Sequence, residues 1–212
     1  MKFVRASEWG RVIARPTTPI GSKIKGFIVH HTASAEPAKH SSCLSSVRAV
    51  QDYHIAQGYQ TIAYSWLGCP HGYLYEGHGF GSLSQAHGDA NTTHLALCFI
   101  GTNPKVTANR REMFEWVRAR MASRKPLAKE ILPHSAVSST ACPGDNWRRF
   151  INKKEYEMAF TDEQEKFLKN LVKEAKEADT TALALARVVK NFRAHKADHG
   201  GAHKHKVTGT AE

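Results

Sequence analysis

Histidine and cysteine residues that could bind a metal lie in two separate parts of the chain. His30 ends a short apolar segment, residues 25–30, while His134 and Cys142 bracket a single loop. A strand can hold His30 rigidly, and a loop of this length can fold back so that both of its side chains reach one ion. Two imidazoles and one thiolate suit zinc, and three ligands leave a fourth position for water, as in catalytic zinc sites. The chain has 13 histidines, so an incidental arrangement remains the alternative.

Alternating strand and helix patterns surround these residues. Short apolar runs at 25–30, 61–67, 72–76 and 93–100 predict strands, with the last one central in the sheet. Helical spacing of apolar residues predicts a helix over about 42–57 and another from a Thr107 cap to about Arg124. Residues 132–146 are expected to form a loop. This order predicts an α/β fold with a mixed central β-sheet flanked by helices.

The chain divides by composition into three parts. Residues 1–154 have the length and apolar content of one globular domain, which would carry the candidate metal site. Residues 155–193 contain a capping box at 161–164, where a charged helical stretch is expected to start. They are predicted to form a C-terminal helical extension that docks on the main domain or self-associates. Residues 194–212 are rich in Gly, His and Lys and predict a flexible basic tail. The tail offers no carboxylate-and-cysteine set beside its histidines, so a solvated tail is preferred over a second metal site.

Charge and composition restrict the partners and the compartment. The formal charge of +11 implies a polyanion, whether nucleic acid, acidic lipid or an anionic cell wall. The basic and aromatic residues show neither a stacking platform nor zinc-finger spacing, which argues against nucleic acid. We find no apolar run long enough for membrane insertion and no secretory leader, and so expect the cytoplasm of the producing cell. Four cysteines in a reducing compartment are expected to be thiols or metal ligands.

Six segments of the chain follow one another in a familiar order. They are residues 7–10, 27–33, 50–54, 62–67 with 72–79, 85–87 with 94–103, and 134–144. In this order they resemble the zinc-dependent N-acetylmuramoyl-L-alanine amidase family, which includes phage lysozyme-type amidases, bacterial autolysins and animal peptidoglycan recognition proteins. The resemblance spans about residues 7–152, and the order of the segments makes it more specific than any one segment.

The resemblance implies a mixed α/β fold, one Zn²⁺ ion, and hydrolysis of the amide between N-acetylmuramic acid and L-alanine. Its ligand positions fall on His30, His134 and Cys142. Tyr64 occupies the position of the catalytic tyrosine, and its ordinary pKa of about 10 makes it a hydrogen-bond donor sooner than a base. Thr140 stands where the family has lysine or threonine, so modest catalytic help is expected. A strand tyrosine packed in the core is the alternative for Tyr64.

Four further residues have two interpretations each or depart from the family. His87 either lines the substrate groove or supports its loop. His31 is a second substrate-binding candidate, but strand neighbours point to opposite faces, which favours a structural histidine bonded to backbone. Cys43 occupies one half of a disulfide known in the animal branch, and Pro37 occupies about the other half. We therefore expect Cys43 to be a free thiol.

The expected partner is peptidoglycan, and the expected role is that of a bacteriolytic phage endolysin acting on the wall after release. A cytoplasmic amidase that recycles muropeptides is one alternative. A recognition protein that binds peptidoglycan without cutting it is another, although such relatives commonly lack the cysteine ligand that Cys142 supplies here.

Overall fold

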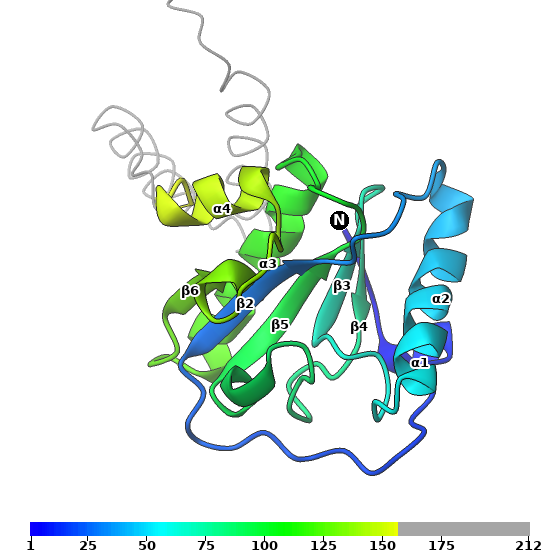
Figure 1. Ribbon diagram of the computed structural model, residues 1–212, viewed down its shortest axis with the longest axis horizontal. Helices are drawn as coiled ribbons and strands as arrows, with labels where there is room; N and C mark the ends of the chain where they lie inside the picture. The colour runs from blue at the N-terminus through cyan, green and yellow to red at the C-terminus, as the bar shows by residue number, and fades with distance from the viewer. Residues whose placement is uncertain (157–212) are drawn as a thin grey trace, which may run out of the picture. The chain divides into compact units, whose positions relative to one another are not determined.

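A six-stranded mixed β-sheet lies at the centre of the computed structural model, which describes residues 1–156 (Figure 1). The strands follow the order β1-β4-β3-β5-β2-β6 across the sheet. The β3–β4 hairpin is antiparallel, and the other four pairings are parallel. The strands are β1 (Lys2–Val4), β2 (Gly26–His31), β3 (Trp66–Cys69), β4 (Tyr73–Glu76), β5 (His94–Phe99) and β6 (Glu130–Pro133).

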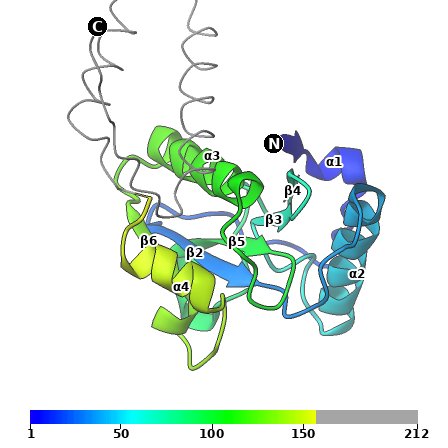
Figure 2. The same cartoon turned by 90° about the horizontal axis from the view of Figure 1, so that it is seen from above.

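Helices cover both faces of this sheet. The α-helices are α1 (Ala6–Trp9), α2 (Cys43–Ala56), α3 (Ala108–Arg124) and α4 (Asp145–Asn152). In both views α1 and α2 lie together on one side, away from α3 and α4 (Figures 1 and 2). The buried apolar residues accordingly form two clusters, one that includes residues of α3 and α4 and one that includes residues of α1 and α2. The predicted fold class is confirmed.

Side-chain alternation on β2 decides which face carries the candidate ligand. Phe27 and Val29 belong to the core beneath α3. Successive side chains of a strand point to opposite faces, so His30 projects toward the α2 side. In the parallel register His30 pairs with Cys98 of β5, and Cys98 belongs to the core beneath α2. The end of β2 thus places His30 beside the central strand.

Helices α2 and α3 match the predicted segments closely; α4 was not predicted as a helix, and the other differences lie in short elements. Thr107 caps α3 by accepting the backbone N–H of Arg110 at 3.4 Å. The strand predicted over 61–67 begins only at Trp66, since the backbone N–H of Ala63 donates to Nδ1 of His54 instead of joining the ladder. The predicted loop from 132 begins inside β6, which pairs with β2, and the sequence pattern also missed β1 and α1.

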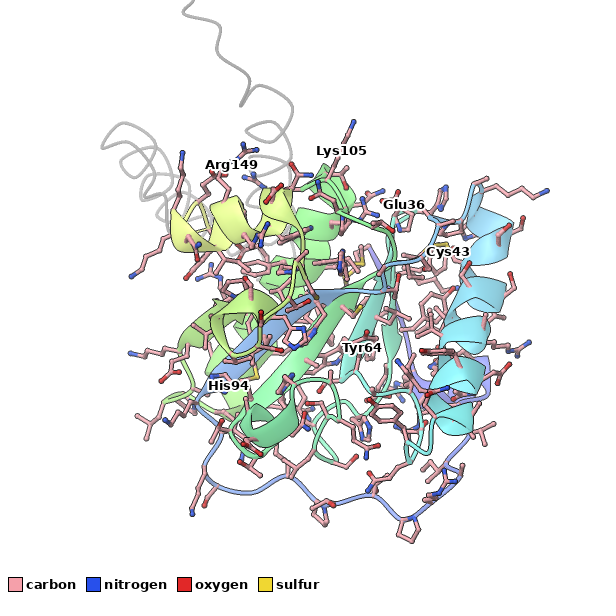
Figure 3. All side chains as sticks on the ribbon, viewed as in Figure 1. Glu36, Cys43, Tyr64, His94, Lys105 and Arg149 are labelled. Atoms are coloured by element: carbon pink, nitrogen blue, oxygen red, sulfur yellow. A yellow bond between two sulfur atoms is a disulfide. The ribbon has the colours of Figure 1, made fainter. Side chains whose placement is uncertain are left out.

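The prediction that Cys43 is a free thiol is wrong, because Cys43 forms a disulfide with Cys69. Cys43 opens α2 and Cys69 ends β3, and their Cα atoms lie 5.9 Å apart, within the usual range for a disulfide. Cys43 is labelled on α2 in Figure 3. The partner depends on how α2 packs over β3, which residue spacing does not reveal. Cys98 is a free buried thiol, as expected.

The predicted helical extension lies outside the described residues except for positions 155 and 156, and so does the basic tail. Self-association through that extension therefore stays a prediction. Within residues 1–156, no helix has both the length and the apolar character needed to cross a membrane.

Candidate metal centre

The structure brings His30, His134 and Cys142 together. One potential ligand atom from each lies within 4.8 Å of the others. His30 comes from the end of β2, whereas His134 opens a short 3-10 helix directly after β6. Because β6 pairs with β2 in parallel, both histidines emerge at the same edge of the sheet. Sheet topology therefore joins two residues that are far apart in sequence.

Local hydrogen bonds fold the loop after β6 back on itself. The backbone N–H of Ser135 donates to the carbonyl of Cys142 at 3.0 Å, which closes the loop beside its own start. The backbone N–H of Cys142 donates to Oγ1 of Thr140 at 3.2 Å. Gly144 then begins the path into α4 at a φ of 91°, a conformation that favours glycine. These bonds hold the Cys142 sulfur at the end of β2.

The donor set fits a zinc ion. A tetrahedral site with Zn–S of 2.3 Å and Zn–N of 2.0–2.1 Å has N···S distances of about 3.6 Å. Nδ1 of His30 lies 3.8 Å from Sγ of Cys142, and the rings of His30 and His134 have centroids 4.3 Å apart. Two imidazoles and one thiolate are also the ligand types that zinc prefers. The three residues could thus bind one ion with small side-chain adjustments.

The electrostatics keep the two imidazoles neutral, as metal ligands must be. Burial, aided by His134, His87 and His31, holds the pKa of His30 well below its usual value. Burial and His31 also lower the pKa of His134. Burial raises the pKa of the Cys142 thiol to about 11, against the backbone N–H of His31, which lies 3.2 Å from the sulfur and favours the thiolate. A bound cation would favour that thiolate further.

A chain of hydrogen bonds fixes the orientation of His30. The carbonyl of His94 can only accept, so Nε2 of His87, 3.0 Å away, must donate to it. Burial lowers the pKa of His87 to about 4, so this ring is neutral and its Nδ1 accepts. Nε2 of His30 lies 3.1 Å from that Nδ1 and therefore donates. The Nδ1 lone pair of His30 is left free, on the side where Cys142 lies.

These hydrogen bonds bear on the two interpretations of His87. Both of its ring nitrogens are engaged inside the protein, and its side chain is buried. Its backbone N–H also donates to Oδ1 of Asn91 at 3.1 Å. Partners that orient a metal-binding histidine fix its tautomer. The geometry thus gives His87 a part in positioning His30, and His87 also lies among the residues that line the cleft beside His134.

Tyr64 lies beside the proposed ligands, between two histidines. Its ring centroid is 5.6 Å from that of His30 and 5.3 Å from that of His54 (Figure 3). Burial and the neighbouring Cys98 thiol raise the pKa of Tyr64 well above its usual value. The phenol is therefore held protonated, as the donor role requires. Residue spacing did not indicate that His54 of α2 packs against this tyrosine.

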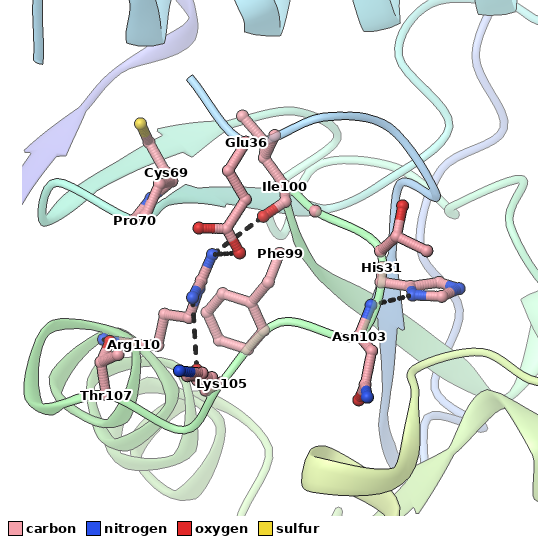
Figure 4. Close-up of polar contacts among 12 residues, drawn as sticks. His31, Glu36, Cys69, Pro70, Phe99, Ile100, Asn103, Lys105, Thr107 and Arg110 are labelled. Carbon is pink, nitrogen blue, oxygen red and sulfur yellow. Dashed lines mark hydrogen bonds and ion pairs between the residues drawn. The ribbon is translucent and has the colours of Figure 1, made fainter. Parts of the chain in front are cut away.

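His31 has a structural role in the site, as strand alternation favours. Its Nδ1 accepts the backbone N–H of Asn103 at 3.2 Å (Figure 4). Asn103 in turn accepts from the backbone N–H and the side-chain amide of Asn146 at the start of α4. His31 thus links the loop after β5 to the Cys142 side of the site, and this ring nitrogen is not free for a substrate.

A buried arginine joins the loops that follow β2 and β5, and residue types alone did not indicate it. Arg110 of α3 is 2% exposed and bonds to the Glu36 carboxylate at 2.6 Å and the Ile100 carbonyl at 2.9 Å (Figure 4). Glu36 lies in the loop after β2. The guanidinium is buried whereas the Glu36 side chain is 42% exposed, and the contact ties the loop next to His30 and His31 to α3.

A cleft of about 510 Å³ opens beside the candidate metal centre. Its walls come from the segment after β4 and from the loop after β6. It is lined by residues 86–90 together with His134, Val137 and Ser138. A candidate ligand, His134, therefore faces a space of a size that can hold part of a large substrate.

Comparisons with known proteins find similarity to peptidoglycan-recognition proteins. No family model matches the chain. Peptidoglycan-recognition protein SC2 of Drosophila simulans is 28% identical over 153 residues, which cover 68% of this chain and 81% of the relative.

Solved structures of the same class are similar in fold. One holds tracheal cytotoxin bound to the ectodomains of peptidoglycan recognition proteins LCa and LCx, and matches with a TM-score of 0.66 and 25% identity over 72% of this chain and 96% of that one. Recognition protein LE, in complex with the same monomeric diaminopimelic acid-type peptidoglycan, matches with a TM-score of 0.65 and 24% identity over 76% and 96%. This chain has the fold of the peptidoglycan-recognition proteins and is similar to them in sequence.

Proposed function

We propose that this chain is a zinc-dependent amidase that hydrolyses the amide between N-acetylmuramic acid and the L-alanine of the stem peptide. The convergence of His30, His134 and Cys142, with ligand atoms within 4.8 Å, carries this proposal. Relatives of the same fold bind a peptidoglycan fragment, which supports peptidoglycan as the substrate. The cleft beside His134 supplies room for the glycan or the peptide.

The chain's own residues have separate parts in this reaction. A zinc ion at the three ligands would supply the Lewis acidity that acidifies a water molecule and polarises a carbonyl. Tyr64, whose raised pKa keeps it protonated, donates a hydrogen bond to the carbonyl oxygen as that oxygen gains negative charge. Thr140 accepts the backbone N–H of Cys142. Its own hydroxyl proton can donate a hydrogen bond to the same carbonyl oxygen. His87 holds His30 in the orientation that directs Nδ1 toward the ion.

Cys142 distinguishes a peptidoglycan hydrolase from a protein that only binds peptidoglycan. The thiol lies 3.8 Å from His30, and a three-ligand site with an open position is the catalytic type. A protein that only binds peptidoglycan has no need of this ligand. The presence of Cys142 in the cluster therefore favours hydrolysis over recognition alone.

Mass spectrometry of purified cell walls after incubation with the full chain tests this proposal. We expect released peptides with a free N-terminal L-alanine, and none with Cys142→Ser, which should still fold and bind walls. Ser139→Ala changes an exposed residue of the same loop and should keep full activity. Turnover by Cys142→Ser would refute the ligand assignment, and wall binding without any product would support the recognition alternative.

The physiological role we propose is lysis, as by a phage endolysin that leaves the cytoplasm of the producing cell to reach the wall. The net charge of +11 supports binding to an anionic wall. Clearing of a suspension of intact sacculi is the expected result. A recycling amidase would instead cut soluble muropeptides and leave the turbidity of sacculi unchanged.

A further inference from the structure

A second group of potential metal ligands lies where the first turn of α2 meets the β3–β4 hairpin. Cys43 is the first residue of α2, Cys69 is the last residue of β3, and His71 lies in the turn that leads to β4. One potential ligand atom from each lies within 4.8 Å of the others. The amidase proposed above uses none of these residues.

The distances from the imidazole nitrogen to the two sulfur atoms match those of a zinc site. Nδ1 of His71 lies 3.5 Å from Sγ of Cys43 and 3.7 Å from Sγ of Cys69. In a tetrahedral zinc site, the N···S distance is about 3.6 Å and the S···S distance about 3.8 Å. Two of the three distances between ligand atoms are therefore already those of a zinc site. Only the two sulfur atoms are too close, because they are bonded to each other.

The backbone around these residues is held on both sides. Cys43 and Cys69 are buried, and their Cα atoms are 5.9 Å apart. Cys69 is paired with Tyr73 across the hairpin, and the backbone N–H of Gly72 donates to the Cys69 carbonyl at 3.1 Å, which closes the turn that carries His71. Rotation of the two cysteine side chains could thus separate the sulfurs without moving the backbone. His71 is only half-buried, so solvent can reach the fourth coordination position.

We propose that reduction of the Cys43–Cys69 disulfide converts this group into a second zinc site, with Cys43, Cys69 and His71 as ligands and water as the fourth. A thiol or phosphine reductant supplies two electrons, and two protons from solvent complete two thiols. Zinc binding then releases those two protons and forms two thiolate bonds. The site is closed to metal while the disulfide is intact.

The difference in zinc binding between the oxidised and the reduced full chain tests this proposal. After reduction with a phosphine and its anaerobic removal, zinc is titrated in competition with a chromophoric chelator. Cobalt(II) is titrated in parallel to detect thiolate-to-metal charge transfer. We expect the reduced chain to bind one more tight equivalent than the oxidised chain. Histidines elsewhere, including those of the basic tail, are the same in both forms and cancel in the difference.

Substitutions at His71 separate a ligand from a neighbour. His71→Ala should weaken binding of the additional ion by about tenfold or more, while His71→Cys, which restores a ligand, should retain it. Cys43→Ser should remove the difference between the two redox states. His40→Ala is the matched control, because the His40 ring contacts the Tyr73 ring, with centroids 4.4 Å apart, but His40 is not in the ligand group. Circular dichroism of each variant confirms folding.

Equal zinc binding by both redox forms would overturn the proposal, as would an additional ion bound with unchanged affinity by His71→Ala. The result is independent of the amidase proposal. A chain carrying Cys142→Ser should show the same gain of one ion on reduction. Conversely, failure of this second site would leave the zinc content and the activity of the oxidised chain unchanged.

Discussion

Replacing His87 with leucine should weaken zinc binding while leaving the fold intact. The substitution removes the acceptor for Nε2–H of His30, a group only 2% exposed. A buried donor left without a partner costs about 1–3 kcal/mol. Loss of a partner that orients a metal-binding histidine typically costs 10–100-fold in affinity, or about 1.4–2.7 kcal/mol. The first cost lowers the stability of the folded chain, and the second gives the effect on metal binding: we expect the zinc dissociation constant to rise about 10–100-fold.

Two control variants show whether the effect passes through the hydrogen bond. His87→Asn can place an oxygen near the position of Nδ1, so its loss of affinity should be less than about tenfold. His78→Leu removes another buried histidine, bonded to Ser82 at 2.8 Å, and should affect stability alone. The assay is chelator competition on the oxidised chain, with folding followed by circular dichroism. Unchanged zinc affinity in a folded His87→Leu chain, or equal losses in His87→Leu and His78→Leu, would refute the positioning role.

Three other changes have definite expected outcomes. Tyr64→Phe should lower kcat about 10²–10³-fold with zinc affinity unchanged, because it removes one donor to the developing oxyanion; a steady-state assay on muropeptides checks it, and an unaltered kcat would remove Tyr64 from the mechanism. Thr107→Ala should reduce the free energy of unfolding by about 1 kcal/mol in a urea titration, because the cap of α3 is lost. Burial lowers the pKa of His54 and of His78 to about 4, from the usual 6.5, so both are neutral in the folded chain. Their contribution to stability is complete above about pH 6.5 and is lost as pH falls toward 4, by up to about 1.4 kcal/mol per pH unit for each group. Denaturant titrations that show constant stability down to pH 4.5 would contradict this.

The sequence was sufficient for the features that depend on local pattern. The apolar run before His30 predicted β2, and the Thr107 cap with its helical spacing predicted α3. Strand alternation alone predicted that His31 would have a structural role while His30 projects to the other face. The predictions of β2 and α3 succeed because side-chain period and capping are properties of neighbouring residues.

Features that depend on how distant elements pack could not be predicted in this way. The Cys43–Cys69 disulfide follows from the placement of α2 over β3, and composition had suggested free thiols. The role of His87 depends on its ring lying between His30 and the His94 carbonyl, which residue type and spacing do not encode. Short β6 was missed because it ends in a proline, which argues against a strand from sequence alone, and its pairing with β2 supplies the missing information.

X-ray absorption at the zinc edge, on the oxidised chain loaded with one equivalent of zinc, tests the central claim most directly. The account predicts one sulfur neighbour at about 2.3 Å and two imidazole nitrogens at about 2.0–2.1 Å, with a lighter fourth ligand. Cys142→Ser should lose the sulfur signal. A zinc environment with no sulfur, or with two, would show that the ion is not held by His30, His134 and Cys142.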